Sequence, residues 1–143
     1  MGYFKIYGTL PEAAILIRKL VFMEEQGFVD EFDDVDNIAK HIVFYNDENK
    51  AVATCRYFSD EENKTCIVGR IAVVKEFRQN HYGRLVLCEA EQQARTAGME
   101  KIRLAAQIQA AGFYQKQGYT IEGDEFLEEH CPHIWMYKKL KEE

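Results

Sequence analysis

The feature that most constrains the fold is a β-branched apolar run that ends in a polar, basic segment and is followed at once by an amphipathic helix. Residues Thr65–Val74 predict a long strand, nearly all apolar in its last part and therefore central in a sheet. A helix expected at Gly83–Ala97 and a short buried strand at Ile102–Ala106 complete a β-α-β unit. This unit predicts one parallel crossover within the sheet.

The flanking segments predict mostly antiparallel pairing. The spacing Thr9-Leu10-Pro11-Glu12 is that of a capping box with Thr9 at the N-cap, and it predicts a helix that continues to about Gln26. Further along the chain we expect a hairpin of His41–Tyr45 with Ala51–Phe58 and a short helix at Gln109–Gln117. A terminal pair of strands is expected at Tyr119–Phe126 and His133–Leu140.

Together these elements predict a single domain over residues 1–143 of mixed α/β (α+β) class. We expect a mainly antiparallel twisted sheet of six to seven strands, a central parallel β-α-β crossover and about four helices.

Composition restricts the chemistry. Eighteen Lys and Arg against 24 Asp and Glu give a net charge of −6, which disfavours non-specific binding to the phosphates of nucleic acid. The four cysteines contain no C-x-x-C pair, so neither a metal site nor a disulfide framework is expected. An apolar signal core and an apolar run of bilayer length are both absent, and we therefore expect a cytoplasmic protein with no membrane association.

The strongest chemical signal is the segment between the apolar strand and its helix, Lys75-Glu76-Phe77-Arg78-Gln79-Asn80-His81-Tyr82-Gly83-Arg84. A strand-to-helix junction offers unpaired backbone N–H groups and the positive end of a helix dipole to a phosphate. The segment resembles the R/Q-x-x-G-x-G/A loop of the GNAT acetyltransferase superfamily, matched by Arg78 and Gly83. His81 stands where that family has its first glycine, at a position that requires positive φ.

A second segment extends the resemblance. The residues Gln107 to Tyr119 are similar to the GNAT pattern N-x-x-A-x-x-F-Y-x-x-x-G-F, and the matching residues are Ala110, Phe113, Tyr114 and Gly118. Shorter similarities occur at Gly69-Arg70-Ile71-Ala72-Val73, Glu24-Glu25-Gln26-Gly27 and Pro132-His133. The resemblance thus covers nearly the whole chain in the order expected of the family.

This resemblance implies an N-acetyltransferase that uses acetyl-CoA, releases CoA and acetylates a primary amine of a small molecule or peptide. It assigns the pantetheine arm to the backbone of Ile71, Ala72 and Val73, and it makes Tyr114 the general acid that protonates the CoA thiolate. The implied cofactor-binding set further contains Arg78, Gln79, Asn80, His81, Tyr82, Gly83, Arg84 and Gln107, together with Tyr114.

A primary amine attacks a thioester only in its neutral form, so a base is required. The candidates are Glu25, His41, Glu128, Glu129, His130 and His133, with a water chain as an alternative. Glu25 and His133 rank first because the resemblance carries both positions. The acidic stretch from Phe28 to Asn37 is expected to be a loop near the acceptor, where it would attract a cationic amine, although such loops are usually only solvated.

Two other functions remain open at this point. The substitution at His81 and the lack of an obvious base are compatible with a CoA-binding module that has little or no catalysis. A third reading is an interaction domain whose acidic stretch, Asp30 to Asp36, meets a basic protein. For an enzyme, the acceptor could be a polyamine, an amino sugar, an amino acid or a protein amine. The resemblance is also compatible with a homodimer, since members of the family often dimerise.

Overall fold

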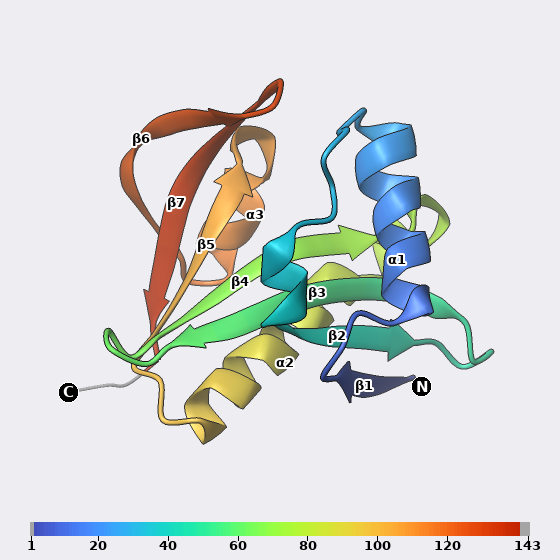
Figure 1. Ribbon diagram of the computed structural model, residues 1–143, viewed down its shortest axis with the longest axis horizontal. Helices are drawn as coiled ribbons and strands as arrows, with labels where there is room; N and C mark the ends of the chain where they lie inside the picture. Colours follow the sequence, from blue (N-terminus) through green and yellow to red (C-terminus); the bar gives the residue numbers. More distant parts are fainter. Residues whose placement is uncertain (1, 141–143) are drawn as a thin grey trace. The chain divides into compact units, whose positions relative to one another are not determined.

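The structure is a computed structural model that describes residues 2–140 (Figure 1). Its strands are β1 (Tyr3–Tyr7), β2 (Lys40–Tyr45), β3 (Ala51–Asp60), β4 (Thr65–Val73), β5 (Lys101–Gln107), β6 (Thr120–Glu128) and β7 (Cys131–Lys139). Its helical segments are α1 (Glu12–Arg18), η1 (Lys19–Glu25), η2 (Asp34–Asn37), η3 (Lys75–Asn80), α2 (Tyr82–Thr96), η4 (Ile108–Ala110) and α3 (Ala111–Lys116).

The seven strands form one sheet in the order β1-β2-β3-β4-β5-β7-β6. The predicted crossover is confirmed: β4 and β5 are parallel, with Thr65 opposite Lys101 and Val68 opposite Leu104. The hairpin of β2 and β3 and the terminal pair of β6 and β7 are antiparallel, as expected. The mixed, mostly antiparallel fold class was therefore predicted correctly, and β4 is the middle strand of the order.

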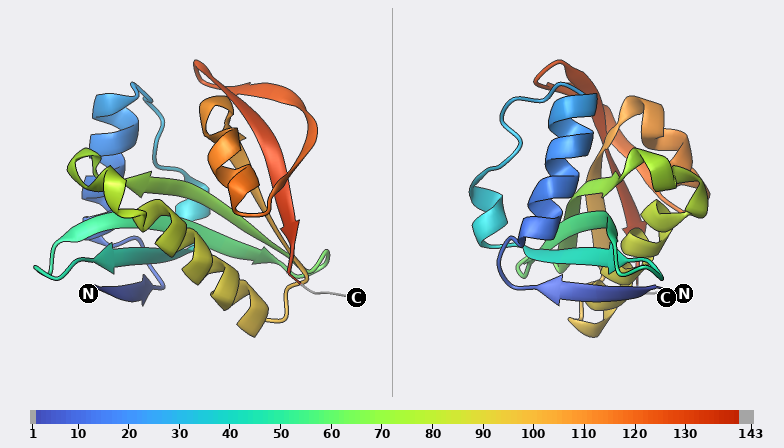
Figure 2. Two further views of the ribbon diagram at one scale, coloured as in Figure 1. Left: turned by 180° about the vertical axis from the view of Figure 1, so that it is seen from behind. Right: turned by 90° about the vertical axis from the view of Figure 1, so that its right-hand side faces the viewer.

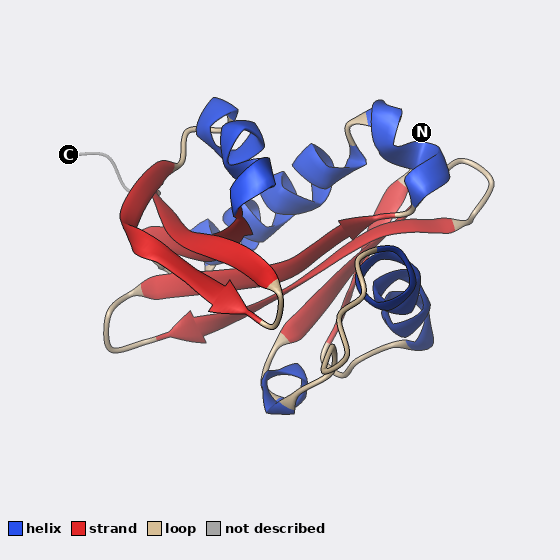
Figure 3. Cartoon of the chain, turned by 90° about the horizontal axis from the view of Figure 1, so that it is seen from above, coloured by secondary structure: helices blue, strands red, loops and turns tan. Residues whose placement is uncertain are grey.

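Residues cluster into two compact units, one of Met1–Phe58 with Arg70–Ala90 and the other of Ser59–Gly69 with Glu91–Glu143. In the first unit, α1 covers one face of β2 and β3 (Figure 1), and α2 begins on the opposite face of the same strands (Figure 2). The view from above shows the strands between these two helical layers (Figure 3). β2 and β3 are thus covered on both faces, which explains the nearly continuous burial of β3.

The first helix changes its winding half-way. Residues Glu12–Arg18 are α-helical and Lys19–Glu25 are π-helical. Ile17, Val21 and Phe22 form a buried apolar cluster with Ala72 of β4. This cluster holds the first helix against the strand that leads into the loop Lys75–Asn80.

In the second unit, β7 lies between β5 and β6 (Figure 1). Ile102, Leu104 and Ala106 on β5 are buried, whereas the alternate residues of that strand are only partly covered. Gly118 takes a φ of +98° after α3, so it ends the helix at the predicted place.

Four details differ from the expectations. Pro11 rather than Thr9 is the N-cap of α1, and no side-chain hydrogen bond caps this helix. Strand β1 was not predicted. The acidic stretch contains the 3₁₀ turn η2, and the loop before α2 contains the longer 3₁₀ segment η3.

Candidate functional site

The junction between β4 and α2 has the geometry that the loop motif requires. η3 ends at Asn80, and the residue after it, His81, has a φ of +62° and a ψ of +26°, which lie in the left-handed region. The next residue, Tyr82, begins the fifteen-residue helix α2. The N–H of Leu85 bonds to the carbonyl of His81, so the N–H groups at the very start of α2 precede the first intrahelical bond. The backbone of His81 therefore has a conformation that glycine adopts more easily.

Arg78, on η3, is engaged by two acceptors within the first unit. Its Nη1 lies 2.6 Å from Oε2 of Glu25 and its Nη2 lies 2.5 Å from Oε1 of the same carboxylate. Its Nε donates to the backbone carbonyl of Val73 at 3.0 Å. The structure thus joins three residues that the sequence assigned to separate roles.

This contact changes the chemistry of Glu25. The hydrogen bond from Arg78 lowers the pKa of the Glu25 carboxyl, with a further contribution from the positive charges of Arg78 and Lys75. A carboxylate with a lowered pKa is a weaker proton acceptor. Glu25 is therefore less suited to act as a base than the sequence suggested.

The strand before the loop is firmly placed. Ala72 is 3% exposed and faces the cluster under the first helix, whereas Ile71 and Val73 are half-buried. Just beyond the strand, Val74 donates its N–H to the carbonyl of Val52 at 2.9 Å. The backbone of Ile71 to Val73 is accordingly held from two sides.

The remaining residues of the expected loop site are on the surface. Gln79, Asn80, His81 and Arg84 are exposed, and Tyr82 and Gly83 are partly buried. Asn80 donates from Nδ2 to the carbonyl of Phe77 at 3.2 Å, which stabilises the 3₁₀ turn. The ring of Tyr82 packs on Phe44, with 5.0 Å between centroids, so its hydrophobic part belongs to the core of this unit.

Tyr114 lies in the second unit, on α3, and is 9% exposed. Its ring contacts Phe113 and Tyr119 edge-on, with centroid distances of 5.1 and 6.0 Å. Tyr119 in turn donates its hydroxyl to Glu91 at 2.7 Å. The phenol of Tyr114 is therefore held in a fixed aromatic cluster and not on a flexible surface.

Gln107 and His133 are neighbours in the second unit. They lie directly opposite each other at the end of the β5–β7 ladder. His133 is 6% exposed, and its Nδ1 lies 2.9 Å from the carbonyl of Cys131. A proton on Nδ1 makes this contact a hydrogen bond and leaves Nε2 as the acceptor. Nε2 lies 3.7 Å from Oε1 of Glu128.

A network of buried ion pairs, which the sequence reasoning missed, organises the acidic stretch in the first unit. Arg18 is 1% exposed and contacts Glu31 at 2.8 Å and Asp36 at 2.7 Å. Arg56 contacts Asp36 at 2.9 Å, and Arg70 contacts Glu31 at 2.9 Å. The expectation of an acidic loop that attracts a cationic amine is therefore wrong for these carboxylates, because arginines already match their charge.

The pKa values within this network shift in opposite directions. Burial raises the pKa of Glu31, although Arg70 and Arg18 oppose that effect. Burial acts in the same sense on Asp36, but hydrogen bonds from Arg18 and Arg56 outweigh it and hold the pKa of that carboxyl well below its usual range. His41 lies against the carbonyl of Asp36 at 3.1 Å, and burial lowers the pKa of its imidazole. His41 is thus part of the network.

One sign of this network was present in the sequence. Arg18 follows Ala14 by four residues and precedes Val21 by three, so it shares the buried face of the helix. A buried arginine requires acidic partners, and the acidic stretch is the nearest source of them. Arg70 has a φ of +53° within β4, a departure that no sequence pattern indicated.

The model of the acetyltransferase (GNAT) family matches residues 13–119. The chain belongs to the GNAT acetyltransferase family. YyaT of Bacillus subtilis, an uncharacterized protein, is 37% identical over 132 residues, which cover 89% of this chain and 87% of YyaT. The uncharacterized N-acetyltransferase YjcF of the same organism is 34% identical over 128 residues, or 87% of this chain and 89% of YjcF.

Solved GNAT structures agree with the fold. A Lactobacillus plantarum protein assigned as an N-acetyltransferase superposes with a TM-score of 0.89 at 26% identity, covering 98% of this chain and 99% of that one. An aminoglycoside 6′-N-acetyltransferase in complex with coenzyme A gives a TM-score of 0.75 at 14% identity, covering 99% and 98%. At 14% identity, the similarity to the aminoglycoside acetyltransferase shows the GNAT fold alone.

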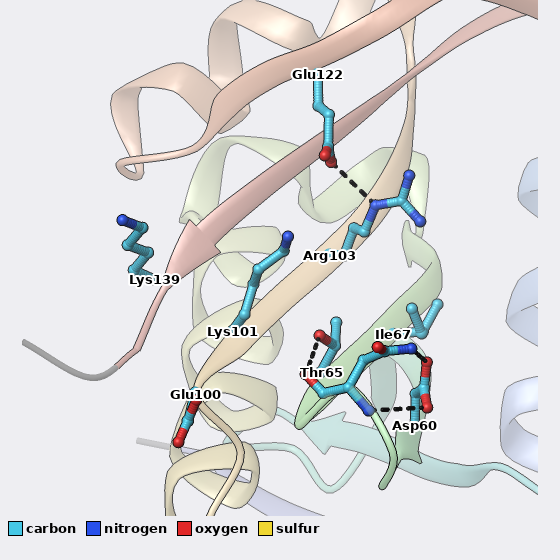
Figure 4. Close-up of a pocket in the computed structure, with 9 residues that line it drawn as sticks. Asp60, Thr65, Ile67, Glu100, Lys101, Arg103, Glu122 and Lys139 are labelled. Carbon is cyan, nitrogen blue, oxygen red and sulfur yellow. Dashed lines mark hydrogen bonds and ion pairs between the residues drawn. The ribbon is translucent and has the colours of Figure 1, made fainter.

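A separate cavity of about 460 Å³ lies in the second unit of this GNAT protein (Figure 4). Its wall includes Lys101 and Arg103 at the start of β5, and Glu122 reaches Arg103 at 3.1 Å. Gln107 lies four residues beyond Arg103 on the same strand, about 13 Å away at the usual rise of a strand. No residue that the sequence assigned to the site lines this cavity.

Two findings concern what residues 2–140 do not contain. Within this range no three His, Cys, Asp or Glu side chains gather closely enough to hold a metal ion. No helix of the same range is both long and apolar enough to cross a bilayer.

The four thiols are free, and Cys88 is the exposed one.

Proposed function

We propose that this chain is a cytoplasmic acetyl-CoA-dependent N-acetyltransferase that acts as a single domain and transfers acetyl directly to a primary amine of a small molecule or peptide. The observation that carries the proposal is the left-handed conformation of His81 between η3 and α2. The GNAT loop motif has glycine at this position, and here the backbone keeps the glycine conformation although the side chain has changed. A backbone that retains this turn retains the direction of the N–H groups that follow it.

The cofactor contacts would come mainly from the backbone. The N–H groups of His81 and of the first residues of α2, Tyr82 to Arg84, would bind the pyrophosphate, because the start of a helix combines free donors with the positive end of the dipole. Ile71, Ala72 and Val73 would pair with the pantetheine arm, and Gln107 and Tyr114 complete the proposed contacts. The CoA complex of the aminoglycoside acetyltransferase supports this assignment of cofactor by fold.

In the proposed reaction, the nitrogen of the amine attacks the thioester carbonyl and forms the new C–N bond while the C–S bond breaks. The leaving thiolate takes a proton from the phenol of Tyr114, and the nitrogen loses one to a base. His133 is the better candidate for that base, because its Nε2 is an acceptor when Nδ1 donates to Cys131. Glu25 is the weaker candidate, because Arg78 lowers its pKa.

A CoA-binding module without useful catalysis is the second candidate. The observation that favours it is the pairing of Glu25 with Arg78, which weakens one of the two leading candidates for the base. An interaction domain that uses the acidic stretch is less well supported, because Glu31 and Asp36 are buried with arginine partners. These functions differ in what they predict for acetyl-CoA.

Two measurements distinguish the candidates. Calorimetry with acetyl-CoA and CoA up to roughly 1 mM, the upper end of common KM values, should show binding for both the enzyme and the module. A panel of primary amines, including polyamines, amino sugars, amino acids and peptides, is then followed by release of free thiol. Thiol release with any amine supports the enzyme, and binding with no release supports the module. Absence of binding refutes both.

A further inference from the structure

The guanidinium of Arg78 is bonded to other groups of the protein. A guanidinium has five N–H donors. In this structure three of them are directed at protein acceptors, namely both carboxylate oxygens of Glu25 and the carbonyl of Val73. The contact with Glu25 is a two-point, charge-assisted pair of 2.5 and 2.6 Å, which is the strongest geometry available to these groups. To bind a phosphate through the same edge, Arg78 would have to release the carboxylate.

The location of the pair indicates what it does instead. Glu25 is the last residue of the π-helical segment η1, and Val73 is the last residue of β4. Val21 and Phe22 of the same π-helical segment already pack on Ala72 of β4. Arg78 adds a polar link between the end of the helix and the end of the strand, while it is itself part of the loop η3.

We propose that Arg78 is a positioning residue, which ties the end of the first helix to the carboxyl end of β4 and sets the course of the loop, and that it is not a ligand of the pyrophosphate. This inference rests on the proposed function, because it concerns the strand and loop to which we assign acetyl-CoA. It also assigns Glu25 a partner in place of a role in proton transfer. The lowered pKa of Glu25 agrees with this assignment, since the carboxylate stays ionised and paired over the working pH range.

The position of Val73 gives the inference a specific consequence. The carbonyl of Val73 accepts the Nε–H of Arg78, so the guanidinium fixes the orientation of this peptide group. Val73 belongs to the segment to which we assign the pantetheine arm. Loss of Arg78 should therefore disturb the binding of pantetheine itself and not only that of the phosphates.

The test compares two ligands on three variants. The ligands are CoA and S-acetylpantetheine, which keeps the arm but lacks the pyrophosphate, and the variants are Glu25→Gln, Arg78→Gln and the double variant. Binding is followed by NMR chemical shifts, which report dissociation constants in the millimolar range. If Arg78 positions the strand, each single variant should weaken both ligands by a similar factor of about 3 to 10, and the double variant should be no weaker than either single one.

Three results would overturn the inference. Arg78→Gln could weaken CoA while leaving S-acetylpantetheine unaffected, which would make Arg78 a direct phosphate ligand. Glu25→Gln could tighten CoA, which would mean that the carboxylate competes with the pyrophosphate for Arg78. Equal affinities of all variants for both ligands would show that the pair does not position the site.

The matched control is the half-buried pair Arg103 and Glu122 of the second unit, joined at 3.1 Å. Arg103→Gln should leave the affinity for both ligands unchanged. Urea unfolding of the same Glu25 and Arg78 variants gives an independent readout. If the two side chains interact, the shift of the unfolding midpoint in the double variant differs from the sum of the shifts in the single variants. If the wild type binds no CoA, the proposed function fails, and additive midpoints would separately overturn the pairing of Glu25 with Arg78.

Discussion

Arg18 donates to both oxygens of Asp36, from Nη1 at 2.7 Å and from Nη2 at 3.1 Å, although both side chains are almost fully shielded from water. Such a pair holds the segment between η1 and β2 against the first helix. Its charges have lost their hydration, so the attraction between them has to replace the lost contacts with water. This relationship leads to the first two predictions.

Asp36→Asn should destabilise the protein by about 3 kcal/mol, because it removes a buried carboxylate that pairs with both Arg18 and Arg56 and leaves their positive charges only partly matched. Urea unfolding at neutral pH measures the loss. Asp34→Asn is the matched control, since Asp34 is in the same 3₁₀ turn but exposed, and it should change the stability by no more than about 0.5 kcal/mol. Equal effects of the two substitutions would mean that the pair contributes nothing specific.

The same carboxylate predicts how stability depends on pH. The pKa of Asp36 is lower in the folded protein than its ordinary 3.8, so the unfolded chain binds the proton more tightly. Its contribution is therefore complete above the ordinary pKa and is lost as the pH falls toward the folded value. Glu31 acts in the opposite sense, because its raised pKa makes its contribution fade as the pH rises.

We expect the free energy of unfolding to fall as the pH drops through 3.8, the ordinary pKa of Asp36, with a slope of up to about 1.4 kcal/mol per pH unit for each proton taken up. In Asp36→Asn this slope should be smaller by about the contribution of one proton. Unfolding curves at a series of pH values test this. An unchanged slope would show that other carboxyl groups cause the acid sensitivity.

The sequence predicted those elements that have strong periodicity or clear breaks. The parallel unit of β4, α2 and β5 followed from an apolar strand, an amphipathic helix and a second buried strand. β1 was not predicted because it lies at the edge of the sheet, where Tyr3, Lys5 and Ile6 are exposed and the sequence has no alternation of apolar and polar residues. The π-helical winding of Lys19–Glu25 leaves no mark in the apolar spacing that predicts a helix.

For the candidate site, short-range features were predictable and long-range pairing was not. The left-handed turn at His81 followed from its place in a glycine motif. The pairing of Arg78 with Glu25 joins residues 53 positions apart in the chain, and a linear pattern carries no signal for it. Carboxylates that look solvated in a sequence can be neutralised by arginines on distant strands, as Arg56 and Arg70 do here.

His81→Gly should raise the stability by up to about 1 kcal/mol, because glycine adopts a positive φ without the steric cost that a side chain incurs. Thermal unfolding measures this change, and calorimetry should show that the affinity for CoA is retained or improved. Lys64→Gly is the control: Lys64 has a φ of +52° in the turn between β3 and β4, so it should gain stability without an effect on CoA. A large loss of CoA affinity in His81→Gly would mean that the imidazole itself contacts the phosphates.

Tyr114→Phe should lower kcat by about 10- to 100-fold, at or below the lower end of the range for a general acid, because the CoA thiolate is a good leaving group. The dissociation constant for CoA should stay nearly the same. Tyr119→Phe is the matched control, since its hydroxyl bonds to Glu91 and it should lose about 1 kcal/mol of stability but little turnover. Unchanged kcat in Tyr114→Phe would exclude the phenol as the acid.

His133→Gln tests the proposed base. In His133→Gln no imidazole remains at this position to take the proton from the amine, so we expect kcat to decrease by at least about 100-fold, whereas CoA binding should persist. His130→Gln replaces an exposed histidine three positions earlier and is the comparison, with kcat expected to stay nearly the same. An unchanged kcat in His133→Gln would exclude His133 as the base. A loss of kcat in His130→Gln alone would assign the proton transfer to the exposed histidine.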